Sequence, residues 1–145
     1  IDLGIPAVIP DDYVYDVHLR LILYKRIASA KSTAELDELK VEFIDRFGLL
    51  PEVTKNLFQI TELRLLAEHI GLEKIDANDN GARILFSEKP NINPAKLIEL
   101  IQTSPKLYRF NGTDTLNITT ELPPNANRIS EITDVLQNLS EQIAA

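Results

Sequence analysis

Two turn sequences rich in Asn, Asp and Gly constrain the fold of this chain more than any other feature. Residues 78–81 read Asn-Asp-Asn-Gly, and residues 111–114 read Asn-Gly-Thr-Asp. Asn and Gly tolerate the positive φ angles that tight hairpin turns require. The segments flanking the two turns have β-strand character, and they are residues 72–77 with 82–87 and residues 106–110 with 115–120. We therefore expect two β-hairpins.

Three helices are expected ahead of the first hairpin. The first runs from about Val14 to Lys31 and follows an acidic pair, Asp11 and Asp12, that suits the positive end of a helix dipole. It is apolar on a wide arc, so we expect it to be largely buried. The residues of this arc are Val17, Leu21, Tyr24, Ile27 and Ala28.

The second and third helices carry clear start and stop signals. Ser32 and Glu35 have the spacing of a capping box, and Gly48 ends the second helix after Phe47. Its apolar stripe is Leu36, Leu39, Phe43 and Phe47. The third helix is expected to have Pro51 at its first position and to end at Gly71.

The remaining segments complete an α+β pattern. Residues 1–10 contain two prolines and indicate an extended segment or an edge strand. Asn93 and Pro94 start a short helix that runs to about Thr103, and a last helix spans about residues 126–143. Its apolar positions are Ile129, Ile132, Leu136, Leu139 and Ile143. We expect an antiparallel or mixed sheet of two hairpins with helices packed against it.

Length and composition favour one domain over residues 1–145. The chain has 145 residues, 44% of them apolar, which is enough for one sizeable core. Its net charge of −7 argues against a nucleic-acid-binding module, because such modules cluster Lys and Arg. No apolar run approaches the ~20 residues of a membrane helix, so we expect a soluble domain without membrane contact. The chain lacks Met, and we expect it to be a piece of a longer protein.

Motifs for catalysis, cofactors or metals are absent from the sequence. It has no cysteine and no glycine-rich phosphate loop. The two histidines, His18 and His69, fall in different helices. Asp11, Asp12 and Asp16 lack the spacing of a calcium loop. We therefore expect a domain that is not an enzyme and has no cofactor or metal site.

The second helix presents a line of carboxylates that we call the acidic stripe: Glu35, Glu38, Glu42 and Asp45. At 100° per residue they fall within about 80° of one another, clear of the apolar stripe. An ordinary solvated helix face explains this pattern. From the pattern alone we favour that explanation over the alternative, a docking ridge for an Arg-rich surface, which rests on the fact that carboxylate–guanidinium pairs can be bidentate and specific.

A second charged group is expected on the hairpins. Lys106, Tyr108 and Arg109 with Arg83 form a small aromatic and basic group. A platform for single-stranded nucleic acid needs several aromatics interleaved with several cations. The cations are few here, so we expect no direct nucleic-acid contact from this chain.

Three sequence blocks resemble the C-terminal domain of the bacterial transcription-repair coupling factors. They are Pro-Asp-Asp-Tyr at residues 10–13, Tyr-Lys-Arg-Ile-Ala-Ser-Ala at residues 24–30, and Leu-Lys-Val-Glu-Phe-Ile-Asp-Arg-Phe-Gly-Leu-Leu-Pro at residues 39–51. The order and separation of the blocks match that family. The resemblance covers essentially the whole chain and implies that it is the last domain of a large multidomain protein.

The resemblance implies a regulatory role in a bacterial, cytoplasmic repair factor. The parent would be an ATP- and Mg-dependent translocase on double-stranded DNA that binds stalled RNA polymerase and recruits the excision repair protein UvrA. ATP hydrolysis would belong to other domains. This domain would dock on the N-terminal UvrA-binding module, mask it and restrain the motor. The alternative is a passive structural cap or interaction domain without an autoinhibitory role.

The same resemblance singles out two residues of the acidic stripe. Glu42 and Asp45 match the acidic docking positions of the family. Glu38 and Glu35 extend the stripe without such a match. Phe43 stands where Leu is more usual, and we expect it to change packing rather than docking.

Overall fold

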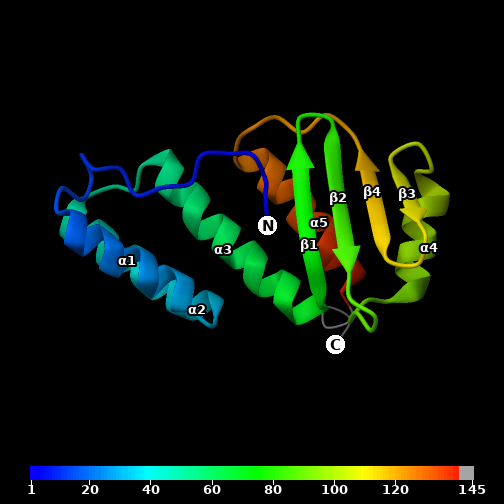
Figure 1. Cartoon of the computed structure of the whole chain (residues 1–145), viewed down its shortest axis with the longest axis horizontal. Helices are drawn as coiled ribbons and strands as arrows, with labels where there is room; N and C mark the ends of the chain where they lie inside the picture. Colours follow the sequence, from blue (N-terminus) through cyan, green and yellow to red (C-terminus); the bar gives the residue numbers. More distant parts are fainter. Residues whose placement is uncertain (141–145) are drawn as a thin grey trace. The chain divides into compact units, whose positions relative to one another are not determined.

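The computed structural model describes residues 1–140 and confirms the predicted α+β class (Figure 1). Three helices precede the first hairpin, a fourth lies between the hairpins, and a fifth follows the second. In chain order the elements are α1 (Val17–Ser29), α2 (Thr33–Phe47), α3 (Glu52–Ile70), β1 (Leu72–Asn78), β2 (Gly81–Phe86), α4 (Pro94–Thr103), β3 (Tyr108–Asn111), β4 (Thr115–Thr119) and α5 (Ala126–Leu139). Ile143, which was expected on the last helix, lies outside the described residues.

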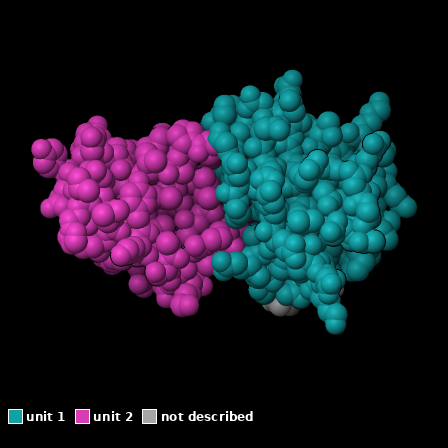
Figure 2. All heavy atoms as spheres, viewed as in Figure 1, with its two compact units in different colours: residues 1–4, 66–145 teal, residues 5–65 magenta. Residues whose placement is uncertain are grey.

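The chain divides into two compact units (Figure 2). The helical unit comprises residues 5–65, and the sheet unit comprises residues 1–4 together with the chain from Leu66 onward. Helix α3 contributes residues to both. The expectation of one domain over residues 1–145 stays a prediction.

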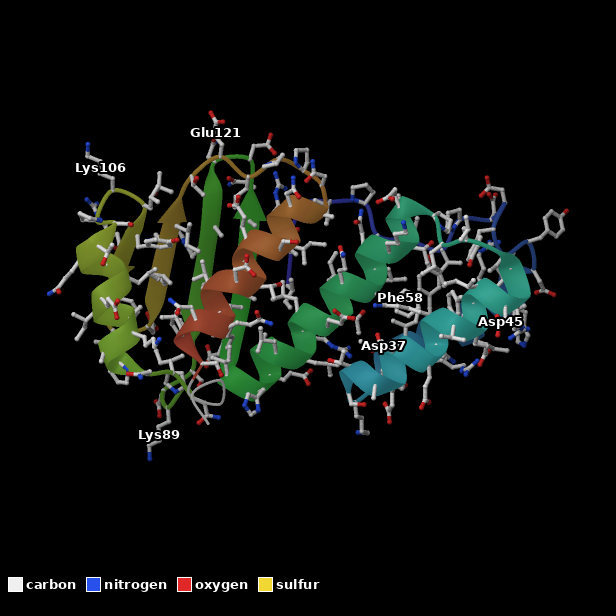
Figure 3. The ribbon with its side chains drawn as sticks, turned by 180° about the vertical axis from the view of Figure 1, so that it is seen from behind. Asp37, Asp45, Phe58, Lys89, Lys106 and Glu121 are labelled. Carbon is white, nitrogen blue, oxygen red and sulfur yellow. The ribbon has the colours of Figure 1, made fainter. Side chains whose placement is uncertain are left out.

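The helical unit is built around a buried cluster contributed by α1, α2 and α3. Phe43 of α2 and Phe58 of α3 are both fully buried, and their rings meet edge to face with centroids 5.3 Å apart. Phe58 is labelled in Figure 3. Tyr13 closes one end of this core, because its hydroxyl donates a 2.8 Å hydrogen bond to the Gly48 carbonyl. The rest of the cluster is Ile9, Val14, Leu23, Ile27, Ala30, Leu36 and Leu39.

Helix α1 starts later and is more exposed than its sequence predicts. Asp16 is its N-cap and accepts a 3.1 Å hydrogen bond from the Leu19 backbone N–H. Of the five residues expected to be buried, only Ile27 is buried, whereas Val17 is 62% and Leu21 is 55% exposed. The stripe that faces the core follows Leu23 and Ile27, four residues apart. The helix offers two apolar stripes, and tertiary packing buries only one of them.

Helix α2 forms as its end signals indicate. Ser32 Oγ accepts a 3.2 Å hydrogen bond from the Glu35 N–H. Glu35 Oε2 reaches back to the Lys31 N–H at 2.5 Å, one residue before the cap. Gly48 ends the helix with φ of 95°, and the predicted apolar stripe faces the core. Helix α3 begins at Glu52, so Pro51 precedes its first residue rather than occupying it.

The sheet of the other unit is fully antiparallel, with strand order β1-β2-β4-β3. Alternate residues of β2 and β4, such as Ile84 and Leu116, are buried on one face. Helix α5 lies behind the sheet in Figure 1 and buries the predicted Ile129, Ile132, Leu136 and Leu139. Gly81 is required at the β2 start, because its φ is 151° and a Cβ there would collide with the Ile118 carbonyl oxygen.

The N-terminal segment and a buried arginine complete this unit. Residues 1–10 contribute no strand, only an isolated bridge between Asp2 and Asp76. Arg128 of α5 is 1% exposed. Its guanidinium donates to the Leu122 carbonyl at 2.6 Å and the Leu3 carbonyl at 2.7 Å. It also pairs with the Asp79 carboxylate at 2.5 Å. One side chain therefore connects α5, the N-terminal segment and the β1–β2 turn.

Candidate docking site

The acidic stripe lies along the outer side of α2 in the helical unit. Glu35, Glu38 and Asp45 are exposed, and Glu42 is half-buried. Asp45 is labelled near the end of α2 in Figure 3. None of the four carboxylates is buried in the core, and their helical spacing keeps them on one edge of a single helix.

Glu42 is engaged by two arginines of its own unit. Arg26 of α1 donates from Nη1 to Glu42 Oε2 at 2.5 Å and from Nη2 to Oε1 at 2.9 Å. Arg46, one turn further along α2, donates to Oε2 at 3.2 Å. The hydrogen bond from Arg26 is the main reason that the pKa of Glu42 falls from 4.5 to about 2. Glu42 is therefore ionised throughout the neutral range and joins α2 to α1.

Three of the four predicted residues line one shallow groove between α1 and α2. Its volume is about 340 Å³. The lining residues are Arg26, Ser29, Ala30, Glu35, Glu38, Leu39 and Glu42. Asp45 lies outside this set. Three carboxylates face one guanidinium across the groove, so its local charge is negative and suits a cationic side chain.

The stripe separates into a partnered pair and an unpartnered pair. Glu35 accepts from the Lys31 N–H, and Glu42 holds the two arginines. The side chains of Glu38 and Asp45 have no hydrogen bond or ion pair with any residue from 1 to 140. These two are seven residues apart, which corresponds to about 10.5 Å along the helix. They are the carboxylates of the stripe that stay fully available to a partner.

An exposed apolar residue, Val41, lies beside these two carboxylates, and Ile44 lies further round the helix; neither was predicted from the sequence. Val41 is 59% and Ile44 is 41% exposed. On a helical projection Val41 falls about 40° from Asp45 and about 60° from Glu38. The sequence did carry a signal for this exposed apolar area, because Val41 and Ile44 are apolar, lie three residues apart in the helix and fall outside its core-facing stripe. A partner surface would therefore meet the charges of the stripe together with the apolar side chain of Val41 on this edge.

The other groups weighed from the sequence do not form sites in the described chain. Across residues 1–140, no group of three or more His, Cys, Asp or Glu side chains could hold a metal. His18 and His69 are both exposed. Within the same residues, no helix has both the length and the apolar character needed to cross a membrane.

The aromatic and basic group on the hairpins is divided between two faces of the sheet. Arg83, Lys106 and Arg109 line a trough on the open face. Tyr108 instead lines a pocket of about 230 Å³ with Ile132 and Val135 of α5. Burial and the nearby Glu131 charge raise the pKa of Tyr108. The cations and the aromatic ring are therefore not interleaved.

Comparisons with known proteins agree on one family. Residues 3–97 match the model of the TRCF domain family. The chain is 53% identical over 140 residues to a transcription-repair-coupling factor of Haemophilus influenzae, covering 97% of this chain and 12% of that protein. It is 43% identical over 145 residues to the transcription-repair-coupling factor of Escherichia coli K12, covering 100% of this chain and 13% of that protein. The chain thus spans about an eighth of the length of these relatives.

A solved structure shares the fold. It is a crystal structure of the C-terminal domain of a transcription-repair coupling factor, which superposes with a TM-score of 0.76. The match covers 99% of this chain and 89% of that chain at 23% identity. The chain belongs to the TRCF domain family, as its sequence resemblance to the C-terminal domain of the transcription-repair coupling factors predicts.

Proposed function

We propose that this chain is the autoinhibitory latch of its parent coupling factor. In this proposal the acidic stripe docks on the N-terminal UvrA-binding module of the same polypeptide and masks the surface that UvrA needs. The docked state also restrains the double-stranded DNA translocase motor. Engagement of RNA polymerase stalled at DNA damage releases the latch. The domain itself contributes no catalysis.

The groove between α1 and α2 is the observation that carries this proposal. It is lined by Glu35, Glu38 and Glu42 against the single guanidinium of Arg26. An incoming arginine finds two further carboxylates there, one of which, Glu38, has no partner among residues 1–140. Planar guanidinium groups bind carboxylates bidentately, which fixes orientation as well as register.

The energy of such a contact suits a reversible switch. Exposed carboxylate–arginine pairs contribute about 0.2–1 kcal/mol each, so several pairs with the apolar Val41 amount to a few kcal/mol. A bias of about 5.5 kcal/mol already moves a two-state equilibrium from 1:99 to 99:1. Binding of the parent to polymerase and DNA needs only to favour the open form by a similar amount.

Glu42 and Glu38 have different roles in this latch. Glu42 is already held by Arg26 and Arg46, so a partner arginine must share its oxygens or displace one of these. Glu38 and Asp45 carry no such competition within residues 1–140. We therefore expect Glu38 and Asp45 to make the direct pairs, and Glu42 to hold the groove in shape while adding negative charge.

The test uses the full-length coupling factor that contains this chain. Glu38→Gln with Asp45→Asn removes two charges without disturbing an ion pair, and UvrA affinity should rise by up to about tenfold, or 1.4 kcal/mol. Glu42→Ala with Asp45→Ala should raise it as well. Glu73→Gln with Glu121→Gln makes the same change of charge on the sheet unit and should leave the affinity unchanged.

Unchanged UvrA affinity in both stripe variants, with the fold intact by circular dichroism, contradicts the latch. Deleting the whole chain separates the latch from a passive cap. The latch predicts higher ATPase activity and DNA binding after deletion, whereas a cap predicts lower thermal stability and lower ATPase activity together. Binding of this chain to the separate N-terminal module should also weaken as salt screens the charges.

A further inference from the structure

The open face of the sheet forms a polar trough that the stripe does not use. The trough has a volume of about 970 Å³ and lies entirely within the sheet unit. Strand register aligns Arg83 of β2 with Asn117 of β4, and Asn117 with Arg109 of β3. The two arginines therefore stand in one row across three strands, with Asn117 between them. Lys106, labelled in Figure 3, lies just before β3 and also lines the trough.

The cations of this face are unpaired, and its carboxylates are engaged. The side chains of Arg83, Arg109 and Lys106 have no ion pair or hydrogen bond with any residue from 1 to 140. Asp76 lies opposite Arg83 in the sheet, but its Oδ2 is 3.3 Å from Lys74 Nζ.

The other carboxylate on this face, Asp2, accepts the Gly4 N–H at 3.2 Å through Oδ1. The chain carries a net charge of −7, yet three cations and only two carboxylates, Asp2 and Asp76, line this trough, so its lining is net positive. The face is therefore complementary to an anion.

The arrangement of the cations favours a protein partner over a nucleic acid. The trough is lined by no aromatic side chain, so it has no ring on which bases could stack. Three cations are also few for a surface that follows a phosphate backbone. Arg83 and Arg109 can each take a carboxylate bidentately, and the amide of Asn117 between them can donate or accept.

The spacing of the row suggests the form of that partner. Two strand spacings separate Arg83 from Arg109, which is about 10 Å. Carboxylates seven residues apart on one face of a helix are about 10.5 Å apart. An extended chain places its same-face residues about 7 or 13 Å apart, which matches less well.

We propose that the open sheet face binds an acidic helical segment of a partner protein through Arg83 and Arg109. Carboxylates at positions i and i+7 of that helix pair with the two arginines, and Lys106 supplies a third positive charge. The site lies in a different unit from the acidic stripe and uses charges of the opposite sign. Its success or failure is therefore independent of the latch.

The test is an NMR titration of the intact chain with two designed peptides. Both are Ala- and Gln-based helices of about 20 residues with two Glu, placed seven residues apart in one and two residues apart in the other. The first peptide should bind at least fivefold more tightly and shift the amide signals of β2, β3 and β4. Arg83→Gln with Arg109→Gln should abolish this preference, whereas Lys25→Gln with Lys96→Gln, which are exposed elsewhere, should retain it.

Three outcomes overturn the proposal. The first is equal affinity for the two peptides, or no signal change on the strands. The second is that the chain binds a DNA duplex but neither peptide, and that the double arginine variant no longer binds the duplex. This result would assign the face to a phosphate backbone. The third is that sedimentation shows the chain to dimerise as its concentration rises, and that the same variant stays monomeric. This result would assign the face to a second copy of this chain.

Discussion

The two units of this chain use arginine–carboxylate pairs in opposite ways. In the helical unit Arg26 and Glu42 meet at the surface, with side chains 43% and 34% exposed. In the sheet unit Arg128 is 2% exposed and pairs with Asp79, which is 77% exposed. A surface pair stays near water and contributes little to stability. A buried guanidinium must satisfy its donors inside the protein, so its loss disturbs everything that it touches.

Replacement of Arg128 should give the largest effect on stability. Arg128→Met removes the donors that satisfy the Leu122 and Leu3 carbonyls while keeping apolar volume. The free energy of unfolding should fall by about 3 kcal/mol, because buried acceptors are left unpaired. Urea denaturation measures this directly. Arg83→Met, at an exposed position of the same unit, should change it by less than about 0.5 kcal/mol. Equal losses in both variants would contradict the view that burial decides the cost of losing an arginine.

The surface pair should give an intermediate effect that a double-mutant cycle can isolate. Arg26→Gln and Glu42→Gln are made singly and together, and the coupling free energy should be about 0.5–1 kcal/mol. The bidentate geometry places it in the upper half of that range. Coupling of about 3 kcal/mol, as large as the loss expected for Arg128→Met, would mean that exposure does not decide the strength of these pairs.

Acid should produce the smallest effect, and its direction follows from the Glu42 pKa. This pKa is about 2 in the folded chain and 4.5 without partners. Because the folded value is the lower one, the pair stabilises the fold fully above pH 4.5 and loses this contribution as pH falls toward 2. Wild type and Glu42→Gln should differ by less than about 1 kcal/mol at pH 7 and converge near pH 2. A difference that grows on acidification would contradict the assignment.

Local signals in the sequence were sufficient for the order of the five helices and the two hairpins among the described residues, but not for all of their ends. The first hairpin and the Ser32–Glu35 cap depend on a few neighbouring residues, and both form as expected. The turn of that hairpin is Asp79 and Asn80, however, and only Gly81, the first residue of β2, has a positive φ there. The prediction that α1 is largely buried was wrong. Two apolar stripes compete on that helix, and only contacts with other elements decide which of them is buried. No local pattern in the sequence predicted that Arg128 is buried, because its acceptors come from the segment at Leu3 and the loop at Leu122.

The candidate site shows the same division between what is local and what is not. Helical periodicity alone put Glu35, Glu38, Glu42 and Asp45 on one edge of α2, because a regular helix fixes the angle between its own side chains. Only the tertiary structure decided how Glu42 is held, since its bidentate partner Arg26 comes from α1, whereas Arg46 lies on α2 itself. In the same way, local turn signals predicted the two hairpins, but only the pairing of β2 with β4 put Arg83 and Arg109 in one row. The physical reason is that angles within one element follow from its backbone, whereas charge pairing depends on segments that only folding brings together.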